Sequence, residues 1–106
     1  MNIIAITACP TGVAHTFMAK KALENAALKL GHNIKVETQG ATGIENEITE
    51  EEVKKADILI LAVEVGIAKK ERFETIKKVN IPIATAIKSA EALIRKTEEK
   101  LKDTQK

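Results

Sequence analysis

The chain has almost no aromatic side chains: its 106 residues include two Phe, no Tyr and no Trp. A mechanism that stacks a flat ring between aromatic side chains is therefore disfavoured, and flavin binding is weakened for the same reason. The single cysteine, Cys9, excludes a disulfide within the chain, so stability must come from packing. This cysteine usage fits a reducing cytoplasm.

Other absences exclude further classes of protein. No apolar run approaches the roughly 20 residues of a membrane-spanning helix, and the N-terminus lacks the pattern of a secretion signal. The formal net charge of +2 is too small to indicate nucleic-acid binding. One cysteine and two histidines, His15 and His32, are too few for a metal site. We therefore expect a cytoplasmic protein with no nucleic-acid partner, no direct membrane insertion and no metal.

The length of the chain allows one domain. A chain of 106 residues can bury one core but not two, and 44% apolar with 30% charged residues is an ordinary soluble balance. We expect a single domain over residues 1–106. The last residues, 102–106, read KDTQK and are expected to fray.

Four segments have the character of β-strands. Residues 2–8 form a β-branched run, and residues 57–63, DILILAV, are the most continuously apolar stretch, as expected of a strand covered on both faces. Residues 33–38 alternate apolar and polar positions, which predicts an edge strand. Residues 81–85 include Pro82, which cannot donate to a ladder, so this strand is also placed at an edge.

Helices are predicted between the strands. Residues 17–30 carry a stripe of Ala and Leu, which lets a helix lie close to a sheet. After a loop over 39–48, Thr49 and Glu52 have the spacing of a capping box and begin a short helix. The last helix is expected from about residue 86 or 89 to residue 101. This alternation predicts an α/β fold, with a parallel sheet and helices on both faces.

Cys9 follows the first predicted strand. In an open parallel sheet, ligands bind outside the carboxyl ends of the strands, at the turns that lead into helices. The residues after Cys9 lead to the N-terminus of a helix, where free backbone N–H groups and the helix dipole favour an anion. A thiolate is such an anion, and helix N-termini lower the pKa of a thiol from about 8.5 to roughly 3.5–7.5. The same N–H groups would hold a phosphoryl group on the sulfur.

Several interpretations of Cys9 compete. A lone cysteine is often an inert buried residue, but Cys-Pro-Thr-Gly at a strand end is not a core composition. Thioredoxin-type exchange requires a second cysteine where the chain has Gly12. Cysteine phosphatases place an arginine where the chain has His15, so the clamp on the phosphate is missing. A site that holds a phosphocysteine but hydrolyses it poorly suits transfer to another molecule.

The motifs around Cys9 resemble a known family. TACPTGVAHTFMA (7–19) resembles the signature of the IIB component of the fructose-type sugar phosphotransferase system. The similarity covers about residues 2–95, because other family segments follow in the same order: KVETQG (35–40), IENEIT (44–49), ADILILA (56–62) and RF (72–73).

The resemblance implies a fold and a function. The family fold is a four-stranded parallel sheet, in the order 2-1-3-4, in a three-layer sandwich with helices. Cys9 would accept a phosphoryl group from a phosphohistidine of the IIA partner and pass it to a sugar, with fructose expected, held by the membrane-embedded IIC partner. The protein would work at the inner face of the membrane through IIC. No cofactor is expected for this step.

We call residues 9–16 the cysteine segment. The residues expected to hold the phosphoryl group are Pro10, Thr11, Gly12, Val13, Ala14, His15 and Thr16. They also form the turn from strand to helix, and both roles can hold at once. His15 either steadies the phosphoryl group or only hydrogen-bonds the loop or caps the helix. Thr16 is expected to be the N-cap of the helix rather than a ligand.

Further candidates lie near the same edge of the predicted sheet. Phe17 and Met18 form a partner-docking rim if exposed, or else pack in the core. Arg72 either contacts the phosphate or lies on a solvated face. The end of the second strand either braces the cysteine segment, touches the partner or is only a polar strand end; its residues are Glu37, Thr38 and Gln39.

Residues 62–78 depart from the family pattern, because Glu64 and Ala68 stand where aspartates are usual. This departure bears on the sugar and on the partner surface, and leaves the cysteine segment unchanged. A second function also stays open: a phosphorylation-sensing regulatory module of the same fold, which does not itself transport sugar. A neighbouring coding sequence for IIA or IIC would separate the two.

Overall fold

A computed structural model describes residues 2–8, 13–40 and 43–104. Within these residues, five strands form one sheet in the order β3-β2-β1-β4-β5. Strand β1 pairs in parallel with β2 and β4, β5 pairs in parallel with β4, and β3 runs antiparallel to β2. The strands are β1 (Asn2–Ala8), β2 (Asn33–Gly40), β3 (Gly43–Glu45), β4 (Ile58–Val63) and β5 (Lys78–Ile81).

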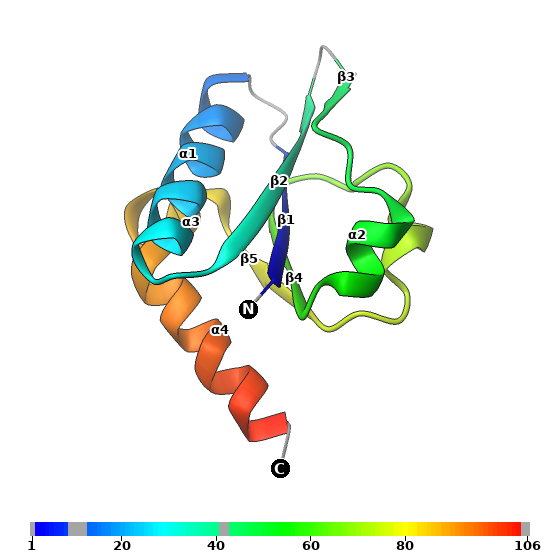
Figure 1. The fold of residues 1–106 in the computed structure, drawn as a ribbon. Coiled ribbons are helices and arrows are strands. Elements are labelled where there is room, and N and C mark those ends of the chain that lie inside the picture. Colours follow the sequence, from blue (N-terminus) through cyan, green and yellow to red (C-terminus); the bar gives the residue numbers. More distant parts are fainter. Residues whose placement is uncertain (1, 9–12, 41–42, 105–106) are drawn as a thin grey trace.

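Helices cover both faces of the sheet (Figure 1). One face packs against α1 (Val13–Lys29), α3 (Ile83–Lys88) and α4 (Ala90–Thr104), and the other against α2 (Glu50–Lys55) and the 3₁₀ helix η1 (Lys70–Phe73). The strands divide between these layers with a period of two: Ile3 and Ala5 of β1 face α1, whereas Ile4 and Ile6 face α2 and η1. The three-layer α/β fold and the order of its four parallel strands are therefore as expected.

Helix α1 lies close to the sheet because its buried stripe is made of small residues. Ala19, Leu23 and Ala27 are fully buried, and Ala26 is 7% exposed. The helix ends at Lys29 and is followed by Gly31, whose φ of +80° is in the left-handed region; the His32 N–H then returns to the Ala27 carbonyl at 2.8 Å. The close packing fixes the position of the helix, including its N-terminus.

Helix α2 begins with the predicted capping box. The Glu52 N–H donates to Thr49 Oγ1 at 3.2 Å, and the Thr49 N–H donates to Glu52 Oε1 at 2.9 Å. Two N–H groups that a short helix leaves without acceptors are thereby satisfied.

The structure corrects the predicted sheet. The segment 39–48 is not a continuous loop, because β3 pairs with Thr38, Gln39 and Gly40 of β2. The prediction of an edge strand is therefore wrong for the carboxyl end of β2, where residues 36–39 are buried. A three-residue strand such as β3 is too short to leave a periodic pattern.

The limits of three elements also differ from the prediction. The fourth parallel strand spans residues 78–81 rather than 81–85, because Pro82 ends it and stands at the N-cap of α3 with a φ of −65°. Helix α1 begins at Val13, before the apolar stripe starts. The final helical region is two helices that meet at Ser89, and the second reaches Thr104.

None of the helices in the described ranges has the length and apolarity that a membrane crossing requires.

The close packing of α1 predicts opposite outcomes for two adjacent residues. Ala27 is fully buried, whereas Leu28 is 78% exposed. Ala27→Leu should lower the free energy of unfolding by about 1–3 kcal/mol, because the added carbons have no space against the sheet. Leu28→Ala should change it by less than about 0.5 kcal/mol. Urea denaturation of both variants measures these changes. An unchanged free energy of unfolding in Ala27→Leu would show that α1 can shift away from the sheet without cost.

Candidate functional site

The carboxyl ends of the three central parallel strands meet at one edge of the sheet. Ala8, the last residue of β1, is in register with Gln39 of β2 and with Val63 of β4. Helix α1 begins at the same edge (Figure 1). Cys9, together with Pro10, Thr11 and Gly12, lies outside the described residues, between the end of β1 and the beginning of α1.

Both ends of the cysteine segment are anchored by hydrogen bonds. On one side, the Glu64 N–H donates to the Ala8 carbonyl at 2.9 Å. On the other side, the buried Thr7 hydroxyl donates to the Thr16 carbonyl at 3.1 Å, which joins β1 to the first turn of α1. The backbone before Cys9 and the first turn of α1 are therefore held side by side.

The N-terminus of α1 offers backbone donors. Because the helix begins at Val13, the N–H groups of Val13, Ala14 and His15 have no acceptor within the helix. The His15 side chain is exposed. Thr16 is 2% exposed and lies within the helix, so the prediction that it is the N-cap is wrong. The local reason is that the helix starts at Val13, four residues earlier than the sequence pattern indicated.

Two large apolar side chains on α1 are exposed beside the cysteine segment. Phe17 is 42% exposed and Met18 is 52% exposed, so the alternative in which they pack in the core is wrong. Val65, two residues after the end of β4, is 40% exposed.

A buried carboxylate lies at the carboxyl end of β2. Glu37 is fully buried and accepts four hydrogen bonds. Its Oε1 accepts from the Ile48 N–H and from Arg72 Nη1, both at 2.8 Å. Its Oε2 accepts from Gln39 Nε2 at 2.6 Å and from Arg72 Nη2 at 3.1 Å. The carboxylate is therefore saturated with donors.

Arg72 uses every N–H of its guanidinium. Besides the two bonds to Glu37, Nη1 donates to the Ile48 carbonyl at 2.7 Å and Nη2 to the Ala68 carbonyl at 3.4 Å. Nε donates to the Lys69 carbonyl at 2.8 Å. The side chain is 7% exposed, so the interpretation as a solvated face is wrong. A phosphate contact would require this arginine to give up one of its five bonds.

Gln39 joins the same cluster to the chain after β4. Its Nε2 donates to the Ala68 carbonyl at 3.2 Å, and its Oε1 accepts from the Ala68 N–H at 2.8 Å. Thr38 is 5% exposed and contributes no side-chain contact to the cluster among those the structure gives. In the part of the chain that the structure describes, Glu37 and Gln39 thus brace residues 48 and 68–72. We call Glu37, Gln39 and Arg72 the buried polar cluster.

The electrostatics of the cluster favour the charged pair. Burial by itself raises the pKa of Glu37, but the hydrogen bonds from Arg72, the Ile48 N–H and Gln39, with the nearby guanidinium charge, bring this pKa below its usual value. The hydrogen bond to Glu37 correspondingly raises the pKa of Arg72. The two side chains therefore form an ion pair at neutral pH.

Glu64 has a role that the sequence interpretation missed. Its Oε1 accepts from the Ile83 N–H at 3.1 Å and so satisfies a donor at the start of α3. Because its own N–H holds the Ala8 carbonyl, Glu64 connects the backbone before Cys9 to α3. The only sign of this role in the sequence is that an acidic residue follows a buried strand.

No group of three metal-ligating side chains is found among the described residues.

The buried pair makes stability depend on pH. Glu37→Gln should lower the free energy of unfolding by about 3 kcal/mol near neutral pH, because it leaves the Arg72 charge buried without its partner. The folded-state pKa of Glu37 is below its usual 4.5, so its contribution is complete above about that pH and is lost as the pH falls through the folded-state value.

Urea denaturation at about pH 7 and about pH 3 measures this effect. The difference between wild type and Glu37→Gln should shrink at the lower pH, whereas the exposed Glu99→Gln should differ from wild type by less than about 0.5 kcal/mol at neutral pH. A difference that does not change with pH would contradict the ion pair.

Comparison with known proteins identifies the family. Residues 4–96 match the family model described as the lactose/cellobiose-specific IIB subunit of the PTS system. The chain is 51% identical over 103 residues to the PTS system fructose-like EIIB component 2 of Escherichia coli K12, covering 97% of both. It is 44% identical over 104 residues to the fructose-like EIIB component 1 of the same strain, covering 98% of this chain and 96% of the relative.

Solved structures agree with these sequence relatives. The solution structure of an enzyme IIB subunit from Escherichia coli K12 superimposes with a TM-score of 0.92 at 44% identity, covering 99% of this chain and 97% of the other. A domain of a fructose-specific IIABC component from Borrelia burgdorferi superimposes with a TM-score of 0.85 at 48% identity, covering 90% of each. The resemblance carried by residues 7–19 is confirmed: the chain belongs to the fructose-type IIB components of the sugar phosphotransferase system.

Proposed function

We propose that the protein carries phosphoryl groups on Cys9 in a fructose-type phosphotransferase system. The Cys9 thiolate bonds to phosphorus as the bond to the histidine nitrogen of the IIA partner breaks. A sugar hydroxyl oxygen held by IIC then bonds to phosphorus and gives up its proton to solvent, the sulfur–phosphorus bond breaks, and the thiolate is released. The observation that carries the proposal is the position of Cys9, directly after the central strand β1 and before the N-terminus of α1.

The N-terminus of α1 supplies the stabilisation that this chemistry requires. Phosphoryl transfer spreads negative charge over the phosphoryl oxygens, and preorganised N–H groups lower the energy of that charge. Val13, Ala14 and His15 have such N–H groups free of the helix, and the bond from Thr7 to the Thr16 carbonyl holds this turn beside the end of β1. Residues 10–12 complete the phosphate site in this proposal.

The lack of a free guanidinium favours transfer over hydrolysis. The arginine nearest the site, Arg72, has all five donors engaged, and the other arginine, Arg95, pairs with Glu91 on α4. A phosphocysteine held by backbone N–H groups keeps its phosphoryl group available to a partner. A cysteine phosphatase would instead clamp the phosphate with a guanidinium.

The exposed apolar side chains beside the site are suited to partner contact. Phe17 and Met18 flank the cysteine segment, and a partner histidine that reaches Cys9 would cover them. We propose that IIA and then IIC dock here, at the cytoplasmic face of the membrane. Fructose is the proposed sugar, because relatives along the full length are named fructose-like. A relative specific for 2-O-α-mannosyl-D-glycerate, 48% identical over 94 residues and matched over 14% of its own length, shows that the family serves more than one sugar.

Cys9→Ser tests the proposal. The wild-type chain should gain one phosphoryl group when incubated with phosphoenolpyruvate, the general phosphotransferase proteins and a fructose-type IIA, and Cys9→Ser should gain none. The hydroxyl is nearly isosteric with the thiol but is not ionised near neutral pH. Intact-protein mass spectrometry measures the gain, and Thr85→Ser serves as a control outside the site.

The outcomes separate the alternatives. Phosphorylation of Cys9→Ser would place the acceptor elsewhere, and no gain in the wild type with a phosphorylated donor would contradict phosphoryl transfer from a fructose-type IIA to Cys9. Phosphorylation without transfer to any sugar, after addition of membranes that contain IIC, would favour the phosphorylation-sensing module.

A further inference from the structure

We propose that the buried polar cluster of Glu37, Gln39 and Arg72 positions the backbone of two loops that IIA contacts when it docks beside Cys9. The loops are residues 46–48, which follow β3, and residues 64–69, which follow β4. We call them the docking loops. This inference rests on the proposed function and deepens it, because it assigns a role to three side chains that do not touch the phosphoryl group.

The cluster holds the main chain of both loops rather than their side chains. Ile48 is held at its N–H by Glu37 and at its carbonyl by Arg72. Ala68 is held at its N–H and at its carbonyl by Gln39. The Lys69 carbonyl accepts from Arg72 Nε at 2.8 Å. A residue whose N–H and carbonyl are both held cannot change its backbone angles without breaking one of these hydrogen bonds.

The loops adopt backbone conformations that need such support. Among the described residues, the only two non-glycine residues with positive φ are Asn46, at +56°, and Lys69, at +57°. One lies in each docking loop, within two residues of a backbone group that the cluster holds. The left-handed conformation is unfavourable for residues with a Cβ atom and persists where the surroundings determine it. An ion pair of 2.8 Å between Glu47 and Lys69 joins the loops on their exposed side.

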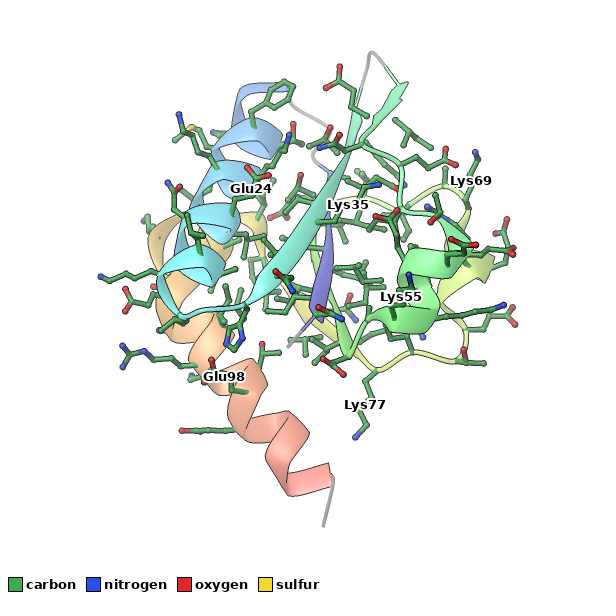
Figure 2. The ribbon with its side chains drawn as sticks, viewed as in Figure 1. Glu24, Lys35, Lys55, Lys69, Lys77 and Glu98 are labelled. Carbon is green, nitrogen blue, oxygen red and sulfur yellow. The ribbon has the colours of Figure 1, made fainter. Side chains whose placement is uncertain are left out.

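One of the loops is tied to the sheet at the end of β1. Gln39, which holds Ala68, is the register partner of Ala8, the residue before Cys9. A single side chain therefore joins Ala68 to the residue that lies beside Ala8 in the sheet. Figure 2 shows Lys69 pointing away from the sheet, on the side of α2. A partner that brings a histidine to Cys9 meets this surface on the opposite side of β1 from Phe17 and Met18.

The cluster acts on partner binding and not on the reacting atoms. All five N–H groups of Arg72 and both oxygens of Glu37 are engaged, either within the cluster or with the backbone of the docking loops. A loop with a fixed shape lowers the ordering cost of docking, so its loss weakens binding. We therefore expect variants of the cluster to raise KM for phosphorylated IIA while kcat changes little.

Gln39→Met and Arg72→Gln test this role. Gln39→Met keeps a side chain of similar size but removes both bonds to Ala68 and the bond from Nε2 to Glu37. Both hydrogen bonds between Glu37 and Arg72 stay in place. Initial rates of Cys9 phosphorylation at increasing phosphorylated IIA should give a KM about tenfold higher, with kcat within about twofold. Hydrogen exchange at the Ala68 N–H should be faster, and the pH dependence of Cys9 alkylation should match the wild type.

Arg95→Gln is the matched control. Arg95 also pairs with a glutamate, Glu91, but its side chain is 63% exposed on α4. Its kinetics should equal those of the wild type.

Three outcomes would overturn the proposal. A loss of kcat at unchanged KM would mean that the cluster acts on the phosphoryl group, and unchanged kinetics with faster exchange at Ala68 would mean that the loops do not contact IIA. If the wild type is not phosphorylated at all, the proposed function fails and this inference with it. If the wild type is phosphorylated and only the kinetics of the variants differ from those expected, the inference fails and the proposed function stands. If Arg72→Gln does not fold, Gln39→Met carries the test.

Discussion

The ion pair of Glu37 and Arg72 is the constraint on which the carboxyl edge of this sheet depends. Both side chains are almost excluded from water, where an unsatisfied charge is very unfavourable. The pair is tolerated because Gln39 and the backbone groups of Ile48, Ala68 and Lys69 satisfy the remaining donors and acceptors. The same requirement fixes the backbone of the two docking loops, because these backbone groups must lie within hydrogen-bond distance of the pair.

The two sides of the proposed site are built by different means. On the side of α1, hydrogen bonds at Ala8 and Thr16 and a small-residue stripe fix a helix N-terminus, whose first N–H groups have no acceptor within the helix. On the side of β2, the charged side chains of Glu37 and Arg72 use their hydrogen bonds to hold the backbone of the two docking loops. Under the proposed function, the nearest arginine shapes the surface and leaves the phosphoryl group to backbone donors, which suits a group that must be released to a partner.

The sequence predicted the parts of this arrangement that depend on local patterns. The β-branched run before Cys9, the apolar segment 57–63 and the capping box at Thr49 each lie in adjacent residues, and all three elements are found. The pairing of Glu37 with Arg72 was not predicted, because 35 residues separate them and a charged residue carries no sign of its burial. The same limit applies to β3, which is three residues long and is defined only by its pairing with β2.

A carrier that serves two partners in turn needs a surface that is open but does not rearrange. Deep burial of Cys9 would exclude the partners, and flexible loops would add an ordering cost to each of two docking steps. Under the proposed function, the exposed Phe17 and Met18 provide a modest apolar contact, and the buried polar cluster provides rigidity without adding exposed apolar area. Affinity then stays low enough for each partner to leave because the area of contact is limited, while the rigid loops keep the ordering cost of each docking step small.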